Sequence, residues 1–313
     1  MPLFSPDPWV TPHSDPDDDH GARTVARKAR RRELVRIRRG LYLPTSRWEE
    51  LEPWEQFRVK IQAVNDAARK PPVFCSQSAA PMWNLPLIDI PDEVETLVMP
   101  GRGGGGSKNG IRRRLGNPDQ SDIVNVEGLW VTSMNQTIRD LAVRLPFAHS
   151  LPSADRAAWF WEQSGRSPEE FAEGIRSTLG GLSKAKRRRV EKVLALADPK
   201  SGSPGESLSR GVMIQAGLPK PELQTKHVDA KGLIGYSDFY WPKHKVVGEF
   251  DGWAKYSRDE YLAGRTPAAI LEAEKIREDR LRATGLRVVR WMWPDARDGV
   301  ELINKLRYAG IKR

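Results

Sequence analysis

The sequence has little cysteine and little histidine. Among 313 residues there are one cysteine, Cys75, and five histidines, so an internal disulfide is excluded and no zinc-type ligand cluster is present. Cys75 lies in Val-Phe-Cys-Ser, a context that predicts a small buried residue rather than a catalytic thiol. This cysteine content is typical of the reducing cytoplasm, and we expect the protein to act there.

Long hydrophobic runs are also absent. No apolar stretch approaches the ~18 residues of a membrane-spanning helix, and the first residues do not have the basic and apolar segments of a signal peptide. Hydrophobic residues still make up 39% of the chain, which is enough for two or three modest cores. We therefore expect a multidomain globular protein with no membrane partner.

Acidic residues are outnumbered by basic ones. The chain has 51 Lys and Arg against 41 Asp and Glu, a net charge of +10 and a pI of about 9.7. Such a charge favours polyanions, and nucleic acid more than an acidic membrane surface. We expect DNA to be the partner.

Basic residues are concentrated near the N-terminus. Nine of them lie between residues 23 and 39, beside one acid, Glu33. The spacing predicts a helix and then two short strands, residues 35–37 and 41–43, around Gly40. A basic helix followed by a basic hairpin is typical of a winged helix, whose wing contacts phosphates, here through Arg36, Arg38 and Arg39. The alternative is a solvated run of charge.

The string Val-Arg-Ile-Arg-Arg-Gly-Leu-Tyr-Leu-Pro (35–44) resembles the wing of AbiEi-type antitoxin regulators. Ser-Gln-Ser-Ala-Ala-Pro-Met-Trp-Asn-Leu-Pro (76–86) and the segment 128–142 resemble the body of the same family. The resemblance spans residues 35–160 and implies a transcriptional regulator that binds DNA and a toxin-like or other protein partner. From its residues alone, this region predicts a mixed α/β core without a catalytic set.

A glycine-rich run occupies residues 101–108. A phosphate-binding loop needs lysine directly after its last glycine, followed by Ser or Thr, whereas here Ser107 precedes Lys108. We predict a flexible loop with four basic side chains that contact a nucleic-acid backbone: Lys108, Arg112, Arg113 and Arg114.

The clearest break in the chain is the Pro- and Gly-rich stretch 198–205. We predict a winged-helix-like DNA-binding segment (1–50), an antitoxin-regulator-like α/β middle domain (51–200) and a nuclease-like domain (201–313). The predicted fold class is α/β. The N-terminal part is winged-helix-like and mixed α/β, and the C-terminal part has the restriction-endonuclease-like order α-β-β-β-α-β.

The C-terminal part carries the carboxylates on which we base the predicted chemistry. Two predicted strands, 234–241 and 246–251, are joined by residues 242–245, so Asp238 lies opposite Glu249, and Asp251 points to the same side. Like charges so placed are destabilising unless a cation lies between them. Carboxylates are ligands that Mg²⁺ or Mn²⁺ prefers.

Upstream of these strands, Ser203 and Pro204 predict the start of a helix that runs to Ala216 and ends at Gly217. Glu206, at its third position, either completes a capping box or binds a metal. Asp251 is either a further ligand or a cap of the Gly252 turn.

Ser-Pro-Gly-Glu-Ser (203–207), Ser-Asp-Phe (237–239), Gly-Glu-Phe-Asp-Gly (248–252) and the segment 274–291 resemble the DUF559-like, very-short-patch-repair-like branch of the PD-(D/E)xK nucleases. The resemblance implies a Mg²⁺ or Mn²⁺ site of Asp238, Glu249 and Glu206. Asp251 stands where lysine is usual, so Lys255, or else Lys275, orients the attacking water; the alternative for both lysines is a plain surface charge. Lys275 and Arg277 contact DNA.

These observations predict a metal-dependent DNA endonuclease or nickase with the catalytic set Glu206, Asp238, Glu249, Asp251 and Lys255. The alternative is a non-catalytic, antitoxin-type DNA-binding regulator in which the nuclease-like domain is a scaffold. The departure at Asp251 favours the regulator, whereas the ordered set Glu206, Asp238 and Glu249 favours the enzyme.

Overall fold

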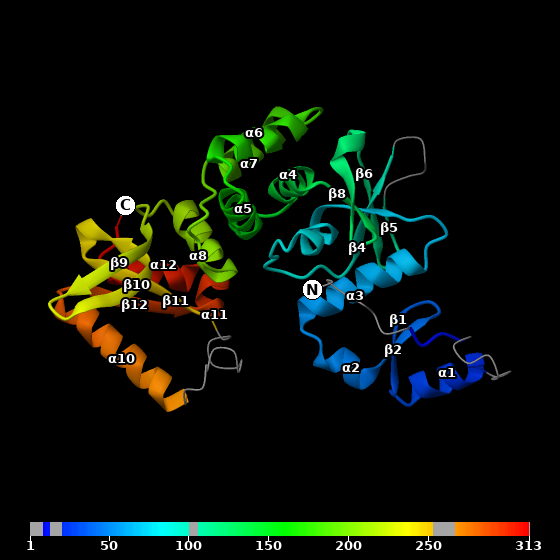
Figure 1. The fold of residues 1–313 in the computed structure, drawn as a ribbon, viewed down its shortest axis with the longest axis horizontal. Helices are drawn as coiled ribbons and strands as arrows, with labels where there is room; N and C mark the ends of the chain where they lie inside the picture. The colour runs from blue at the N-terminus through cyan, green and yellow to red at the C-terminus, as the bar shows by residue number, and fades with distance from the viewer. Residues whose placement is uncertain (1–8, 13–20, 100–105, 253–266, 313) are drawn as a thin grey trace. The chain divides into compact units, whose positions relative to one another are not determined.

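The computed structural model describes residues 9–12, 21–99, 106–252 and 267–312. The fold is mixed α/β, as predicted, with sheets of two, six and four strands. The chain forms two compact units (Figure 1). Unit 1 contains Met1–Val143 and Glu173–Leu182, and unit 2 contains Arg144–Ala172 and Ser183–Arg313. None of the helices in the described ranges is long and apolar enough to cross a membrane.

Unit 1 begins with the basic region. Helix α1 (Gly21–Arg30) is followed by strands β1 (Leu34–Arg38) and β2 (Leu41–Pro44), and then by α2 (Thr45–Glu50) and α3 (Pro53–Asp66). The two strands pair antiparallel around Gly40, whose φ of 82° suits a residue without a side chain. The predicted order of helix and hairpin is confirmed. Val10 adds a bridge to Tyr42 of β2.

The rest of unit 1 is built on a six-stranded sheet in the order β5-β6-β4-β3-β8-β7. Its strands are β3 (Val73–Phe74), β4 (Val94–Val98), β5 (Gly106–Lys108), β6 (Ile111–Leu115), β7 (Ile123–Val126) and β8 (Leu129–Thr132), and α4 (Met134–Arg144) follows. Phe57 and Ile61 of α3 pack on this sheet with Phe74 and Val131. Cys75 is buried, as predicted.

The glycine-rich run differs in part from its prediction as a loop. Gly106 to Lys108 form β5, paired antiparallel with β6, because the chain reverses at Asn109 and Gly110, both with positive φ. Residues 101–105 of the run lie outside the described ranges.

Unit 2 starts earlier than the predicted boundary near residue 201. Helices α5 (Phe147–Gln163) and α7 (Lys184–Leu194) belong to it together with α8 (Pro204–Gln215), while α6 (Pro168–Arg176) spans the division. The linker 198–205 does not separate domains because Arg210 of α8 forms a buried ion pair with Asp155 of α5 at 2.6 Å. The amide of Asp198 also donates to Asp155.

The four-stranded sheet of unit 2 has the order β12-β11-β10-β9. After α8 come β9 (Glu222–Asp229), β10 (Gly232–Trp241), β11 (Val246–Asp251), α10 (Pro267–Ala283), β12 (Arg287–Met292), α11 (Trp293–Asp298) and α12 (Val300–Tyr308). The predicted order α-β-β-β-α-β is therefore confirmed. Helix α8 also ends as predicted, with Ala216 as its C-cap.

The sheet of unit 2 has one apolar face and one charged face. Phe239, Trp241, Val246 and Phe250 are buried on the apolar face. Helix α8 packs there, because Gly205 lies directly against the Phe250 ring and Ser209 accepts a hydrogen bond from the Trp291 indole at 2.8 Å. The opposite face carries the carboxylates and is met by α10.

Candidate functional site

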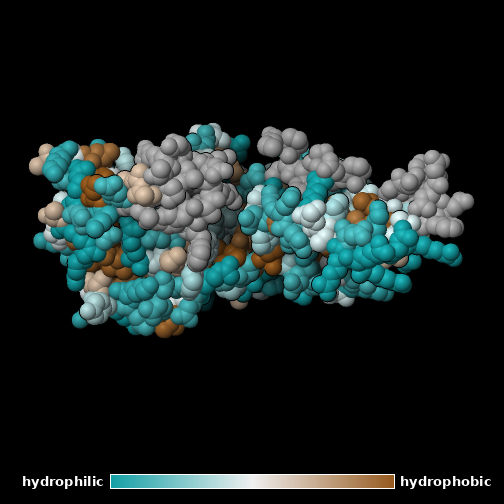
Figure 2. Space-filling model, turned by 90° about the horizontal axis from the view of Figure 1, so that it is seen from below, coloured by the Kyte–Doolittle hydropathy of each residue, from teal (hydrophilic) through white to brown (hydrophobic). Residues whose placement is uncertain are grey.

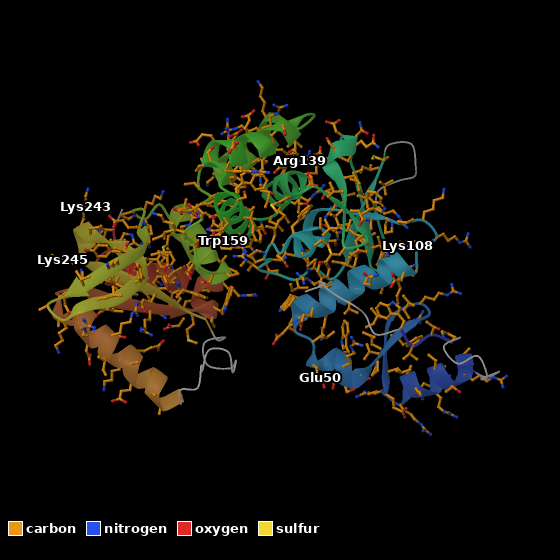
Figure 3. The ribbon with its side chains drawn as sticks, viewed as in Figure 1. Glu50, Lys108, Arg139, Trp159, Lys243 and Lys245 are labelled. Atoms are coloured by element: carbon orange, nitrogen blue, oxygen red, sulfur yellow. The ribbon has the colours of Figure 1, made fainter. Side chains whose placement is uncertain are left out.

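The register of β10 and β11 brings two acidic residues together. The paired residues are Trp241↔Val246, Tyr240↔Val247 and Phe239↔Gly248, so the next residues along the two strands are Asp238 and Glu249. Lys243 and Lys245 lie at the turn that joins the strands (Figure 3). The predicted placement of the two acids is therefore confirmed, and it follows from the length of this turn.

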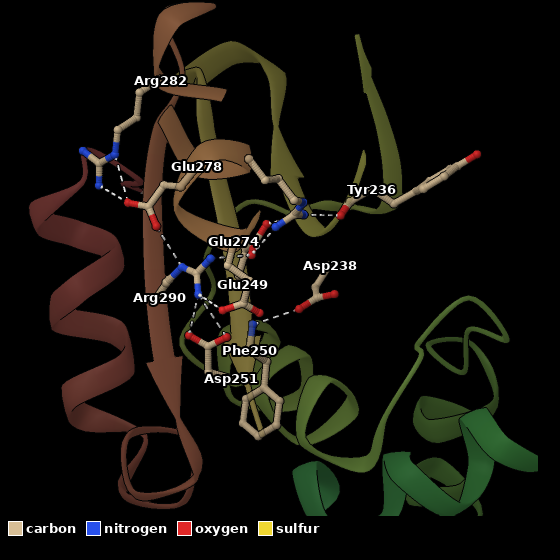
Figure 4. Close-up of polar contacts among 10 residues, drawn as sticks. Tyr236, Asp238, Glu249, Phe250, Asp251, Glu274, Glu278, Arg282 and Arg290 are labelled. Atoms are coloured by element: carbon tan, nitrogen blue, oxygen red, sulfur yellow. Dashed lines mark hydrogen bonds and ion pairs between the residues drawn. The ribbon is translucent and has the colours of Figure 1, made fainter. Parts of the chain in front are cut away.

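Asp238 is held by a backbone group of the neighbouring strand. Its Oδ2 accepts a hydrogen bond from the Phe250 amide at 2.9 Å (Figure 4). Its Oδ1 accepts from Nε2 of Gln224, on β9, at 3.4 Å. The Asp238 side chain thus binds an amide of β11 two residues beyond the last paired residue, Gly248, which fixes the carboxylate at this end of the hairpin.

Glu206 reaches the same cluster from the start of α8. Ser203 caps the helix by accepting from the Glu206 amide at 3.2 Å. The Glu206 carboxylate accepts from the Gly202 amide at 2.9 Å and from Gln224 Nε2 at 3.0 Å. The reciprocal bond of a capping box would go to the amide of Ser203, whereas here Glu206 binds the preceding residue and turns towards Gln224 and Asp238.

The electrostatics of this cluster favour a bound positive charge. Burial, and then repulsion from Asp238, raise the pKa of Glu206 to about 7. Hydrogen bonds from the Ser203, Gly202 and Gln224 groups act in the opposite direction and are outweighed. Near neutral pH, the Glu206 carboxyl is therefore protonated part of the time. A bound cation would stabilise its charged form beside Asp238.

Glu249 already has a cation beside it. Arg277 of α10 donates to both of its oxygens, at 2.9 and 2.7 Å, and Arg290 of β12 lies at 3.4 Å. The hydrogen bond to Glu249 is the main cause that raises the pKa of Arg277. The charge of this carboxylate is therefore compensated by the protein itself, because α10 brings Arg277 onto the charged face.

Asp251 pairs with the same strand. Arg290 Nη1 lies 3.2 and 3.4 Å from the two Asp251 oxygens, and Arg290 also contacts Glu278 and Glu274 (Figure 4). The parallel pairing of β11 with β12 places Arg290 next to Glu249. Arg290 thus supplies a positive charge near the position where the resemblance implies a lysine.

The two candidate lysines are placed differently. Lys255 lies outside the described residues. Lys275 is exposed on α10, where it borders a shallow hollow with Glu274, Glu278 and Asp279. Within the described ranges, no three His, Cys, Asp or Glu side chains are arranged to hold a metal ion.

Gln224 is a site residue that the sequence analysis missed. It lies on β9 between the pairs Leu223↔Phe239 and Thr225↔Ser237, opposite Asp238. Its φ of 48° is in the left-handed region, a strained state for a non-glycine residue that costs about 1–3 kcal/mol and is typical of functional sites. The sequence signal that could have found Gln224 is the antiparallel pairing of two consecutive strands, β9 and β10, which places Gln224 opposite Asp238.

The arginines of the predicted wing are placed in unit 1. Arg36 and Arg39 are exposed, whereas Arg38 is half-buried. Arg38 Nη1 donates to the carbonyl oxygen of Asn109 at 3.4 Å, between β5 and β6. All three arginines thus lie on or beside the β1–β2 hairpin, as predicted.

Known proteins add little to this geometry. No protein-family model matches the chain, and no curated protein matches it. The crystal structure of the RV2827C protein from Mycobacterium tuberculosis is similar over 68% of this chain and 78% of that one, at 15% sequence identity and a TM-score of 0.36. A likeness this distant carries no functional argument.

Proposed function

We propose that this protein is a Mg²⁺- or Mn²⁺-dependent endonuclease or nickase that hydrolyses DNA phosphodiester bonds. The observation that carries the proposal is the pair Glu206 and Asp238, held together by Gln224. Burial and repulsion in this pair raise the pKa of Glu206 to about 7. Such a pair gains free energy from a bound cation. The resemblance to the PD-(D/E)xK nucleases supplies the reaction class.

The donor chemistry of the cluster fits a hard divalent ion. Glu206 and Asp238 supply carboxylate oxygens, which Mg²⁺ and Mn²⁺ prefer. Glu249 is a third ligand only after Arg277 releases it, because both of its oxygens now accept from that guanidinium. When bound, the ion polarises the scissile phosphate and lowers the pKa of the attacking water.

The remaining side chains have roles that do not require ligation. Gln224 positions the two carboxylates. Arg290 holds Asp251 in place at 3.2 Å. Arg277, once released from Glu249, can neutralise a phosphate. Lys255 is the proposed group that orients the water, with Lys275 as the second choice.

The test is cleavage of supercoiled plasmid DNA with Mg²⁺ or Mn²⁺, with nicked and linear products scored separately. Asp238→Asn and Glu206→Gln should abolish cleavage, since each removes a ligand. Glu222→Gln, an exposed acid at the start of the same strand as Gln224, is the matched control and should leave cleavage unchanged. If wild-type protein cleaves DNA with neither Mg²⁺ nor Mn²⁺, the nuclease proposal is wrong.

A second function has its own supporting observation. Arg277 forms an ion pair with Glu249. The positive charge beside this carboxylate thus comes from an arginine of the protein, and a metal ion is not needed there. This favours an antitoxin-type regulator that binds DNA and a toxin-like or other protein partner, with the C-terminal unit as a scaffold. For either function we propose the cytoplasm as the place of action, where the buried Cys75 remains a thiol.

A further inference from the structure

Two hairpins of unit 1 meet at an arginine. Arg38, at the end of β1, donates from Nη1 to the carbonyl oxygen of Asn109 at 3.4 Å, which is at the tip of the β5–β6 hairpin. A β-bulge between Arg36 and Arg38 interrupts the register of β1 there, and bulges re-aim side chains in this way. Hairpins that are 71 residues apart in the sequence are thereby joined.

At this junction a second guanidinium group, that of Arg113, acts electrostatically on Arg38. Burial lowers the pKa of Arg38, and repulsion from Arg113 of β6 lowers that pKa further. Among the described residues, neither guanidinium forms an ion pair. Two neighbouring positive charges without an acid are destabilising in the free protein and gain free energy from a bound anion.

The arginines of β6 are divided between its two faces. Arg112 pairs with Glu93 at 2.6 Å, and Arg114 pairs with the buried Glu95. Arg113 points to the other face. Lys108 shares that face, because the antiparallel pairs are Lys108↔Ile111 and Gly106↔Arg113. Lys108 and Arg113 are both exposed, so only this face of the hairpin offers uncommitted charge.

The first hairpin is surrounded by polar residues. In Figure 2 the described residues on the right of the view, where Figure 1 has α1 and the β1–β2 hairpin, are mostly hydrophilic. The basic residues Arg36 and Arg39 of that hairpin are exposed. Exposed charge of one sign suits a ligand with regularly spaced anions, which describes a nucleic-acid backbone.

We propose that Arg36, Arg38, Arg39, Lys108 and Arg113 form one surface that binds the phosphate backbone of duplex DNA, and that Arg112 and Arg114 do not take part. We call it the two-hairpin surface. Its contacts are made by charged side chains of two hairpins with phosphates, so it positions the protein without reading base sequence. It rests on the proposed function only in taking DNA as the nucleic acid.

The experiment is the salt dependence of binding to a short fluorescent DNA duplex, measured with EDTA so that no cleavage occurs. Each phosphate contact that is lost should reduce the slope of log K against log salt by about 1. Arg113→Ala and Lys108→Ala should each show this reduction and weaken binding equally for unrelated sequences. Arg112→Ala, on the same strand, should leave the slope unchanged.

Thermal melting without DNA separates a structural effect from a binding effect. Arg113→Ala should keep or raise the melting temperature, because a repulsion is removed. Arg112→Ala should keep or lower it, because Glu93 loses its partner. Equal slopes for the Arg112 and Arg113 variants would overturn the proposal, as would an RNA duplex bound more tightly than the DNA duplex. Both outcomes are independent of plasmid cleavage, so the nuclease proposal can fail while this one stands.

Discussion

At the scale of single residues, the chemistry depends on the carboxylates and on what neutralises each of them. Glu206 and Asp238 share the amide of Gln224. Glu249 and Asp251 share Arg290. Glu249 and Asp251 thus have arginine partners, whereas Glu206 is held by hydrogen bonds and a proton. The proposed metal ion would act first at Glu206.

Glu206→Gln should change how stability depends on pH. The pKa of Glu206 is raised from 4.5 to about 7, so the folded state binds this proton more tightly than the unfolded chain. The resulting stabilisation is fully present below about pH 4.5 and is lost as pH rises through about 7. It amounts to at most about 3 kcal/mol.

The measurement is chemical denaturation of wild type and Glu206→Gln at a series of pH values. The difference between their unfolding free energies should change between about pH 4.5 and 7 and stay constant above that range. A constant difference over the whole range would mean that the Glu206 proton is not coupled to folding.

Gln224 should prove to be a positioning residue with a strained backbone. Gln224→Gly removes the amide and also relieves the positive φ, so it should keep or raise the melting temperature without metal. It should nevertheless weaken the rise in melting temperature caused by Mn²⁺, because Glu206 and Asp238 lose their common donor. Gln224→Asn, as the conservative variant, tests whether a shorter amide rescues the ion effect. An unchanged ion effect in the glycine variant would contradict this role.

At the scale of elements, α10 determines whether the Glu249 carboxylate on the charged face has a positively charged partner. Its Arg277 binds Glu249 in a bidentate pair and also donates to the carbonyl oxygen of Tyr236. The helix therefore joins β10 and β11 through one side chain. Any ion that uses Glu249 must compete with this guanidinium.

Arg277→Ala should lower the melting temperature without metal, by about 1–3 kcal/mol in stability, because the buried Glu249 loses its bidentate partner. It should increase the stabilisation caused by Mn²⁺, since the competitor is gone. Arg282→Ala breaks an exposed pair on the same helix and is the control, with changes within about 0.5 kcal/mol. An ion effect of the same size in wild type and Arg277→Ala would show that the two cations do not compete.

Helix α8 depends on glycine where it meets β11. A Cβ on Gly205 would overlap the Phe250 ring, and the ring is packed against Trp293 at a centroid distance of 5.2 Å. Gly205→Ala should therefore cost about 1–3 kcal/mol through overpacking. Gly202→Ala, whose Cβ would meet only the ends of the Glu206 and Gln224 side chains, should cost less. Denaturation midpoints compare the two variants.

At the scale of the whole molecule, the units do not follow the apparent linker. Arg210 and Asp155 are both almost fully buried, and they join α8 to α5 across residues 198–205. A fragment that begins at residue 201 leaves Arg210 without its partner, which costs about 3–5 kcal/mol. The covering helices are part of the fold of unit 2.

A fragment of residues 201–313 should therefore fail to unfold cooperatively, whereas a fragment of residues 144–313 should do so. Thermal denaturation followed by circular dichroism makes the comparison, and limited proteolysis checks it. Cooperative unfolding of the shorter fragment would show that α5 and α7 are dispensable.

Some features could be predicted from the sequence because they depend on local pattern. The hairpin of residues 234–251 is set by alternation and by a short turn, so counting outward from Trp241 and Val246 places Asp238 and Glu249 correctly. The start of α8 follows from Ser203 and Pro204. The basic helix and hairpin near the N-terminus follow from spacing and from Gly40. Each of these features is determined within a few residues of chain.

Other features were decided by tertiary structure, because they join residues that are distant in sequence. Arg277 and Arg290 lie 28 and 41 residues from Glu249, and Asp155 lies 55 residues from Arg210. A single sequence contains no signal for which arginine meets which acid, since every arginine carries the same charge and reach. The packing of α10 determines which arginine compensates Glu249 in the candidate site. The packing of α5 determines where unit 2 begins.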